Sequence, residues 1–99
     1  MILDSLLPDA VQNHAALLAA QAALSAQASA LAHLVRRLEA LRRTVPTGDA
    51  DFRWHGAAHS AYRSSVRELG GRLDEAIAVA AAAHLDSRRA LTAIDARVR

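Results

Sequence analysis

A leucine repeat in steps of seven, inside a long stretch without helix breakers, constrains the fold of this chain most strongly. Between Pro8 and Pro46 the sequence contains neither proline nor glycine. The repeat consists of Leu17, Leu24, Leu31, Leu38 and Val45, and a helical wheel places Leu34, Val35 and Leu41 on the same face. This spacing is typical of a coiled-coil seam. We therefore predict a helix over residues 8–43, with Pro8 and Asp9 suited to its first turn.

One break separates this segment from a second apolar stripe. Pro46 blocks continuation of a helix and Gly48 permits a reversal, so we predict a turn over residues 44–54. A second helix is expected over residues 55–98, because apolar residues recur there in steps of three and four. Its stripe comprises Tyr62, Val66, Leu69, Leu73, Ile77, Ala80, His84, Leu91, Ile94 and Val98.

Gly70 and Gly71 conflict with this second helix, because two glycines cost about 2 kcal/mol relative to two alanines in a helix interior. Two interpretations stay open. The helix tolerates a kink at this point, or the missing side chains allow a close crossing of the two helices.

Two helices of this length predict one all-α domain over residues 1–99, an antiparallel two-helix hairpin. Such a hairpin shields only one stripe of each helix from water, so we expect it to dimerise into a four-helix bundle. Aspartate at Leu31 and Leu38 should then abolish the dimer. The predicted interface comprises Leu17, Leu24, Leu31, Leu34, Leu38, Leu41, Tyr62, Val66, Leu69, Leu73, Ile77, Leu91 and Ile94.

Composition excludes several classes of protein. Hydrophobic residues make up 53% of the chain, which argues against a disordered segment, and the absence of cysteine excludes disulfides and Cys-based zinc sites. Twelve arginines are nearly balanced by ten carboxylates, for a net charge of +2. That excess is weak support for nucleic-acid binding. The N-terminus does not resemble a Sec signal peptide, and the longest apolar run, residues 76–83, is too short to span a membrane.

The most informative stretch is Phe52-Arg53-Trp54-His55-Gly56, just after the helix break. An indole at a bend can cover the end of the hairpin. Gly56 removes a side chain beside that ring, which allows either tight packing or an unusual backbone angle. Small residues follow at the start of the second helix, and Tyr62 begins its apolar stripe.

Trp54-x-Gly56 at the centre of a helical hairpin of this length resembles the WXG proteins, the hundred-residue substrates and partners of type VII (ESX) secretion. Ala61 and Tyr62 match the small-then-aromatic continuation of that family. The resemblance covers essentially the whole chain. It implies a four-helix bundle formed with itself or with a related hairpin, and a turn motif, Trp54 and Gly56, that forms part of an export signal. It also implies that the chain is cytoplasmic before export by a leaderless route.

The sequence departs from the family at one point. The second half of the export signal is a Tyr-x-x-x-Asp/Glu motif near the C-terminus of one partner, whereas Tyr62 is followed four residues later by Val66 and no other tyrosine exists. We therefore expect the chain to act as a secreted substrate that borrows this signal, or as a targeting or chaperone partner that is not itself exported. The helical N-terminal domain of a larger secreted effector is one expected partner, and a secretion ATPase is another.

Other residue patterns give weaker evidence about function. His55 and His59 have a four-residue spacing that zinc ligands often show, but no third ligand follows at a diagnostic spacing, so we predict no metal and no cofactor. His59 has three serines near it, Ser60, Ser64 and Ser65, but a single helix gives them no pocket. We therefore predict that the chain is not an enzyme. Arg42 projects near the seam, which favours an ion pair between chains.

Two alternatives to the WXG function stay open. The first is a basic helical protein that binds nucleic acid or an anionic membrane, and the second is a generic coiled-coil module.

Overall fold

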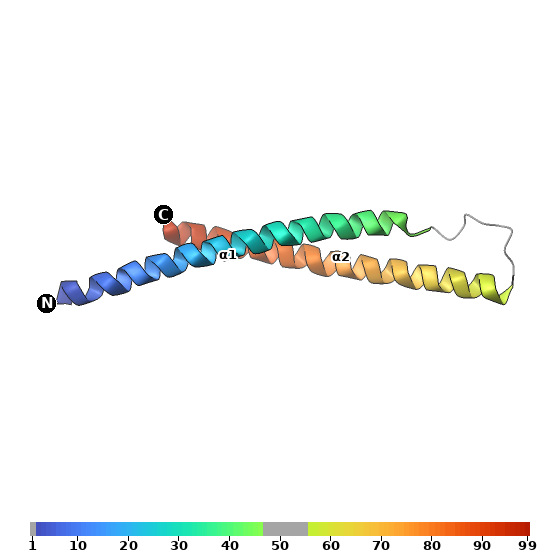
Figure 1. The fold of residues 1–99 in the computed structure, drawn as a ribbon, viewed down its shortest axis with the longest axis horizontal. Helices are drawn as coiled ribbons and strands as arrows, with labels where there is room; N and C mark the ends of the chain where they lie inside the picture. The colour runs from blue at the N-terminus through green and yellow to red at the C-terminus, as the bar shows by residue number, and fades with distance from the viewer. Residues whose placement is uncertain (1, 47–55) are drawn as a thin grey trace. The chain divides into compact units, whose positions relative to one another are not determined.

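The computed structural model describes residues 2–46 and 56–99, with the side chains of residues 9–46 and 56–99. This part of the chain contains two helices, α1 (Ile2–Thr44) and α2 (Ala57–Val98), and no strand (Figure 1). The prediction of two long helices in an all-α chain is confirmed. Helix α1 begins at Ile2, earlier than the predicted start near residue 8, and it continues through Pro8. Trp54, and most of the predicted turn with it, lies outside the described residues.

Local hydrogen bonds mark the end of α1. The Thr44 hydroxyl donates to the Leu41 carbonyl at 2.6 Å, and the Val45 amide donates to the Arg42 carbonyl at 3.2 Å. Both bonds satisfy carbonyl groups that the last turn of a helix leaves without intrahelical donors. Arg42 and Arg43 also lie in this last turn, where positive charge is favoured by the helix dipole. The predicted stop before Pro46 therefore has a local cause.

Gly56 immediately precedes the second helix. Its φ is +105°, a backbone conformation that side chains strongly disfavour, and its carbonyl accepts the Ser60 amide at 3.0 Å. A Cβ at this position would meet no atom within 4 Å. Of the two roles predicted for Gly56, the structure therefore shows the unusual backbone angle.

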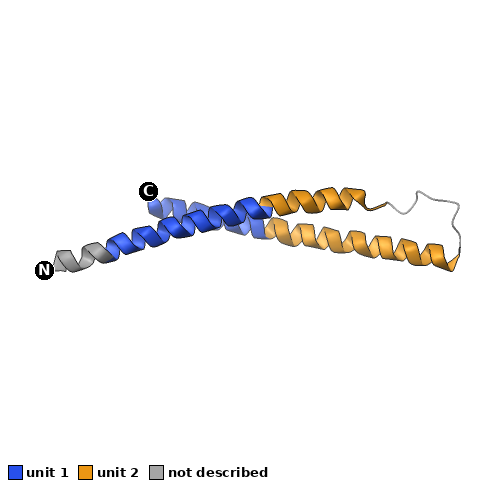
Figure 2. Cartoon of the chain, in the orientation of Figure 1, with its two compact units in different colours: residues 1–31, 83–99 blue, residues 32–82 orange. Residues whose placement is uncertain are grey.

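The described contacts divide the chain into two compact units, each made from a part of both helices (Figure 2). Unit 1 comprises residues 1–31 and 83–99, and unit 2 comprises residues 32–82. In unit 1 the helices run antiparallel, because Gln21 bonds to Asp95 whereas Gln27, further along α1, bonds to the earlier Ser87. In unit 2 the last turn of α1 contacts α2 through Arg42 and Asp74.

Apart from Asp95 and half-buried alanines at the border, such as Ala20 and Ala32, the residues that α1 and α2 bury against one another follow an alternation of three- and four-residue steps. In α1 they are Leu17, Gln21, Leu24, Ala28, Leu31, Val35, Leu38, Arg42 and Val45, and in α2 they include Val66, Gly70, Leu73, Ile77, Ala80, His84, Ser87, Leu91, Ile94 and Val98. We call these two rows the seam. The period is that of a two-stranded coiled coil.

The seam is thin. Ala28 and Ala80, 5% and 6% exposed, are the only buried apolar residues in the described part of the chain, and no large side chain there is fully buried. The leucines, isoleucines and valines of the seam are half-buried. Because burial of apolar surface drives folding, the described helices leave much of that driving force unused.

Candidate helix-pairing surface

The structure separates the predicted interface residues into two groups. Those that lie in the seam are Leu17, Leu24, Leu31, Leu38, Val66, Leu73, Ile77, Leu91 and Ile94, each half-buried within the chain itself. The others, Leu34, Leu41, Tyr62 and Leu69, are 43%, 53%, 47% and 51% exposed. The stripe predicted from the sequence is therefore two surfaces. The first joins α1 to α2, and the second faces outward.

The four exposed residues belong to unit 2 and lie on one side of its seam. On α1, Leu34 and Leu41 each follow a seam leucine by three residues; on α2, Tyr62 and Leu69 each precede a seam residue by four. Because the helices are antiparallel, these positions turn to the same side of the pair. We call Leu34, Leu41, Tyr62 and Leu69 the exposed flank.

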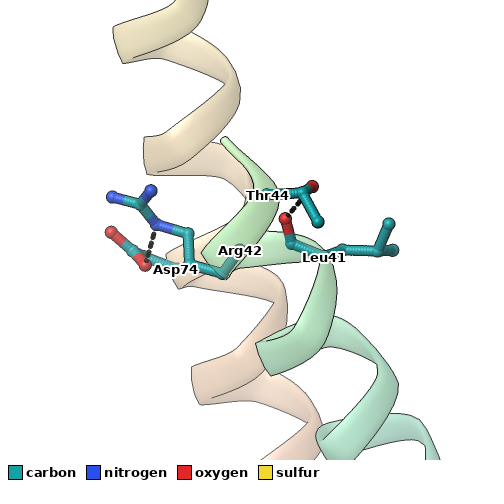
Figure 3. A network of polar contacts seen from close by, with 4 residues as sticks. All are labelled: Leu41, Arg42, Thr44 and Asp74. Carbon is teal, nitrogen blue, oxygen red and sulfur yellow. Dashed lines mark hydrogen bonds and ion pairs between the residues drawn. The ribbon is translucent and has the colours of Figure 1, made fainter. Parts of the chain in front are cut away.

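The opposite side of the seam in unit 2 is polar. Arg42 Nε donates to Asp74 Oδ1 at 2.8 Å, and the Leu41 side chain points away from this pair (Figure 3). The Arg42 and Asp74 side chains are 38% and 60% exposed, so solvent screens the pair and its contribution to stability is at most about 1 kcal/mol. Arg42 was predicted to pair with a residue of another chain, whereas in this structure its partner, Asp74, lies in the same chain.

Gly70 makes room for that arginine. A Cβ on Gly70 would lie 3.1 Å from Arg42 Nη2, whereas a Cβ on Gly71 would meet nothing within 4 Å. Helix α2 continues through both glycines. Of the two interpretations left open for Gly70 and Gly71, a close approach is seen at Gly70, where it is made by a side chain of α1 and not by the helix backbone. Gly71 has no such role among the described contacts.

A polar layer crosses the seam in unit 1. His84 Nδ1 lies 3.0 Å from the Ala28 carbonyl oxygen, to which it donates because a carbonyl can only accept. Beside it, Gln27 Nε2 donates to the Ser87 hydroxyl at 2.9 Å, and Ser87 is 3% exposed. His84 was predicted to lie in the apolar stripe of the second helix, and the structure places it in the seam with its side chain half-buried.

Sequence reasoning missed seam positions that carry no large apolar side chain. The predicted stripe did not include Gln21, Ala28 or Ser87, because it was defined mainly by large apolar residues, and Arg42 was predicted only to project near the seam. The signal that could have found them is the alternation of three- and four-residue steps, which places each of them between apolar neighbours.

Two shallow depressions lie on unit 1. One, of about 530 Å³, is lined by His84, Leu85, Arg88, Arg89 and Thr92, and the other, of about 360 Å³, lies between Leu18 and Asp95. Neither presents paired catalytic groups. Over residues 9–46 and 56–99, no three histidine or carboxylate side chains are grouped so as to hold a metal ion. His55, one of the two histidines considered as zinc ligands, lies outside the described residues.

Helix α1 has a property that the lengths of its apolar runs do not indicate. Its segment Asp9–Thr44 contains a window with mean hydropathy 1.4, long and apolar enough by composition to cross a membrane, and 6% of that window is buried. The signal lies in the charges, since none occurs between Asp9 and Arg36. Many alanines, broken by glutamine and serine, produce this hydropathy without a continuous apolar run.

Comparisons with protein-family models, curated proteins and solved structures find no match to this chain.

Proposed function

We propose that this chain is a WXG-type helical protein of a type VII secretion system, without enzymatic activity. It acts as a secreted substrate, or as a targeting or chaperone partner, by packing its two helices against those of a second hairpin to form a four-helix bundle. The observation that carries the pairing is the absence of a fully buried large side chain among the described residues.

The exposed flank supports the same proposal. Four large apolar side chains on one side of unit 2 are about half exposed, while the other side carries the Arg42–Asp74 pair. A row of this kind is what a second pair of helices covers in a bundle. The assignment to WXG proteins rests on the sequence, on Trp54 and Gly56 at the break between two long helices. The positive φ of Gly56 gives a physical reason for glycine at that position.

The placement of the side chains changes the variant that tests pairing. Aspartate at Leu31 and Leu38 would disrupt the seam and unfold the hairpin itself, so loss of a complex would be uninformative. Aspartate at Leu34 and Leu41 leaves the seam intact and charges the exposed flank. In the presence of a helical partner, light scattering should show that this variant stays monomeric. Its helical circular dichroism should be unchanged. A complex of unchanged mass would contradict the proposal.

The secretion assignment has a separate test. In cells with an active type VII system, Trp54→Ala should reduce the amount of this protein, or of its partner, in the culture medium. The intracellular complex should keep its mass, because the substitution acts on the export signal rather than on the seam. Unchanged export of this variant would contradict the secretion role and leave only the pairing role standing.

A second candidate function is favoured by one observation, the uncharged, mostly exposed apolar segment of α1, which suits a membrane. Against it, Gln21 and Gln27 of this segment donate to Asp95 and Ser87 of α2, and a helix inserted in lipid would lose these partners. Co-sedimentation with neutral phosphatidylcholine vesicles tests it. Binding that Leu18→Asp removes would favour the membrane, and no binding would exclude it.

A further inference from the structure

We propose that the exposed flank binds an acidic amphipathic helix of a different chain, whose carboxylates meet Arg37 and Arg72. The inference rests on the proposed pairing function and names the chemistry of the partner.

The apolar residues of the flank have the spacing that a docked helix requires. Leu34 and Leu41 are seven residues apart on α1, and Tyr62 and Leu69 are seven residues apart on α2. Seven residues correspond to about 10 Å along a helix. Because Arg42 lies over Gly70, Leu41 and Leu69 are at about the same level, and Leu34 and Tyr62 lie one heptad away on either side of them. A third helix with a heptad repeat matches the spacing of this row. A lipid surface has no such period, so the regular spacing favours a helix.

The charged residues one helical turn from the flank residues are arginines. Helical neighbours lie three or four residues apart. Among the residues at those distances from the four flank residues, the charged ones are Arg37, between Leu34 and Leu41, and Arg72, three residues after Leu69. No carboxylate occupies such a position, while Asp74 lies on the opposite side with Arg42. A partner helix that packs here therefore brings its flanking residues to two guanidinium groups.

Arg72 remains able to bind a carboxylate of another chain although it already forms an ion pair within α2. Its Nη2 lies 2.7 Å from Glu68 Oε1, one turn away, and the Arg72 side chain is 76% exposed. A guanidinium has five N–H donors, so this bond leaves others for an incoming carboxylate.

The same charges disfavour a second copy of this chain on the flank. Residues 32–82 contain eight arginines and six carboxylates, whereas the rest of the chain contains four of each, so the net charge of +2 lies in unit 2. Two copies joined through their flanks would bring Arg37 and Arg72 of one against those of the other. Such like-charge contacts select against self-pairing and favour a partner of opposite charge.

The experiment uses the full chain and two synthetic helical peptides of about four heptads. Both carry leucine at the core positions; one has glutamate and the other has lysine at the flanking positions. Fluorescence anisotropy near physiological salt measures the two dissociation constants. We expect the glutamate peptide to bind about tenfold more tightly or better, with a preference that falls as salt rises. Equal binding of the two peptides would overturn the inference.

Matched variants show whether the flank is responsible. Exchange of both Arg37→Glu and Arg72→Glu should reverse the preference, while the double variant Arg36→Glu and Arg67→Glu, with the same change of net charge off the flank, should retain it. Leu41→Ser with Leu69→Ser should weaken binding about tenfold, and Leu85→Ser, exposed in unit 1, should not. Reversal by the control pair of arginines, or indifference to the leucine pair, would overturn the inference.

Two further measurements separate this inference from the proposed function. The first is self-association and the second is binding to anionic phosphatidylglycerol vesicles. If the chain forms a homodimer or binds the vesicles, and Leu41→Ser with Leu69→Ser removes that interaction, the flank has another occupant and the inference is overturned. A homodimer that survives these changes, with no preference for the glutamate peptide, would overturn the inference and leave the pairing function standing. Failure to associate with itself or with either peptide would overturn both.

Discussion

At the scale of single residues, the two adjacent glycines of α2 differ in what surrounds them. Gly71 meets nothing within 4 Å of a Cβ, so Gly71→Ala should raise the free energy of unfolding by up to about 1 kcal/mol through helix propensity. Gly70→Ala should raise it less, because its Cβ must displace the Arg42 guanidinium. Thermal unfolding of both variants measures the difference. Equal gains would contradict the position of Arg42 over Gly70.

For Gly56 we predict that substitution by alanine lowers the free energy of unfolding, the opposite of the effect at Gly71. With φ at +105°, Gly56→Ala should lower the free energy of unfolding by about 1–2 kcal/mol, because a Cβ is disfavoured in that conformation. Gly71→Ala is the matched control, since it makes the same chemical change at a helical glycine. Circular dichroism melts should move in opposite directions for the two variants. A stabilising Gly56→Ala would show that the positive φ is absent in solution.

At the scale of the helices, the sequence predicted the elements well and their partners poorly. The leucine repeat and the break at Pro46 predicted two helices, and the helix ends on either side of the break lie near those observed because helix signals are local. The start of α1 was predicted near residue 8, whereas the helix begins at Ile2. The repeat could not tell Leu34 and Leu41 from Leu31 and Leu38, since all four fall on one broad face of a wheel. Only the antiparallel packing decides which of them meet α2. Arg42 and Gly70 show the same limit, because their contact depends on the register between the helices.

The small residues of the seam set the distance between the helices in each unit. Ala28 is 5% exposed, so Ala28→Leu should cost about 1–3 kcal/mol, because a larger side chain has no space in the closely packed polar layer beside His84 and Ser87. Ala26→Leu, on an exposed position of the same helix, should be close to neutral. Urea unfolding of both variants measures the costs. A tolerated leucine at Ala28 would indicate a looser seam than the structure has.

At the scale of the whole molecule, the candidate surface could be predicted only in outline. The expectation that the chain needs a partner follows from its length and from two helices that cannot enclose a core, and the sequence alone suffices for this expectation. The position of the surface does not follow, because four flank residues had to be separated from the half-buried seam. The polarity of its border also required the structure, which places Asp74 on the far side and Arg37 and Arg72 on the near side.

The most direct test of the central claim is the thermal unfolding of the isolated chain, followed by circular dichroism with and without a helical partner. Since no large side chain among the described residues is fully buried, we expect the chain alone to melt below about 45 °C, the lower end of the usual range for small domains. A saturating partner, such as the glutamate-flanked peptide, should raise the midpoint, and its concentration should set the increase. A monomer that melts cooperatively above about 60 °C, with a midpoint that no helical partner raises, would contradict the claim that its core is completed by pairing.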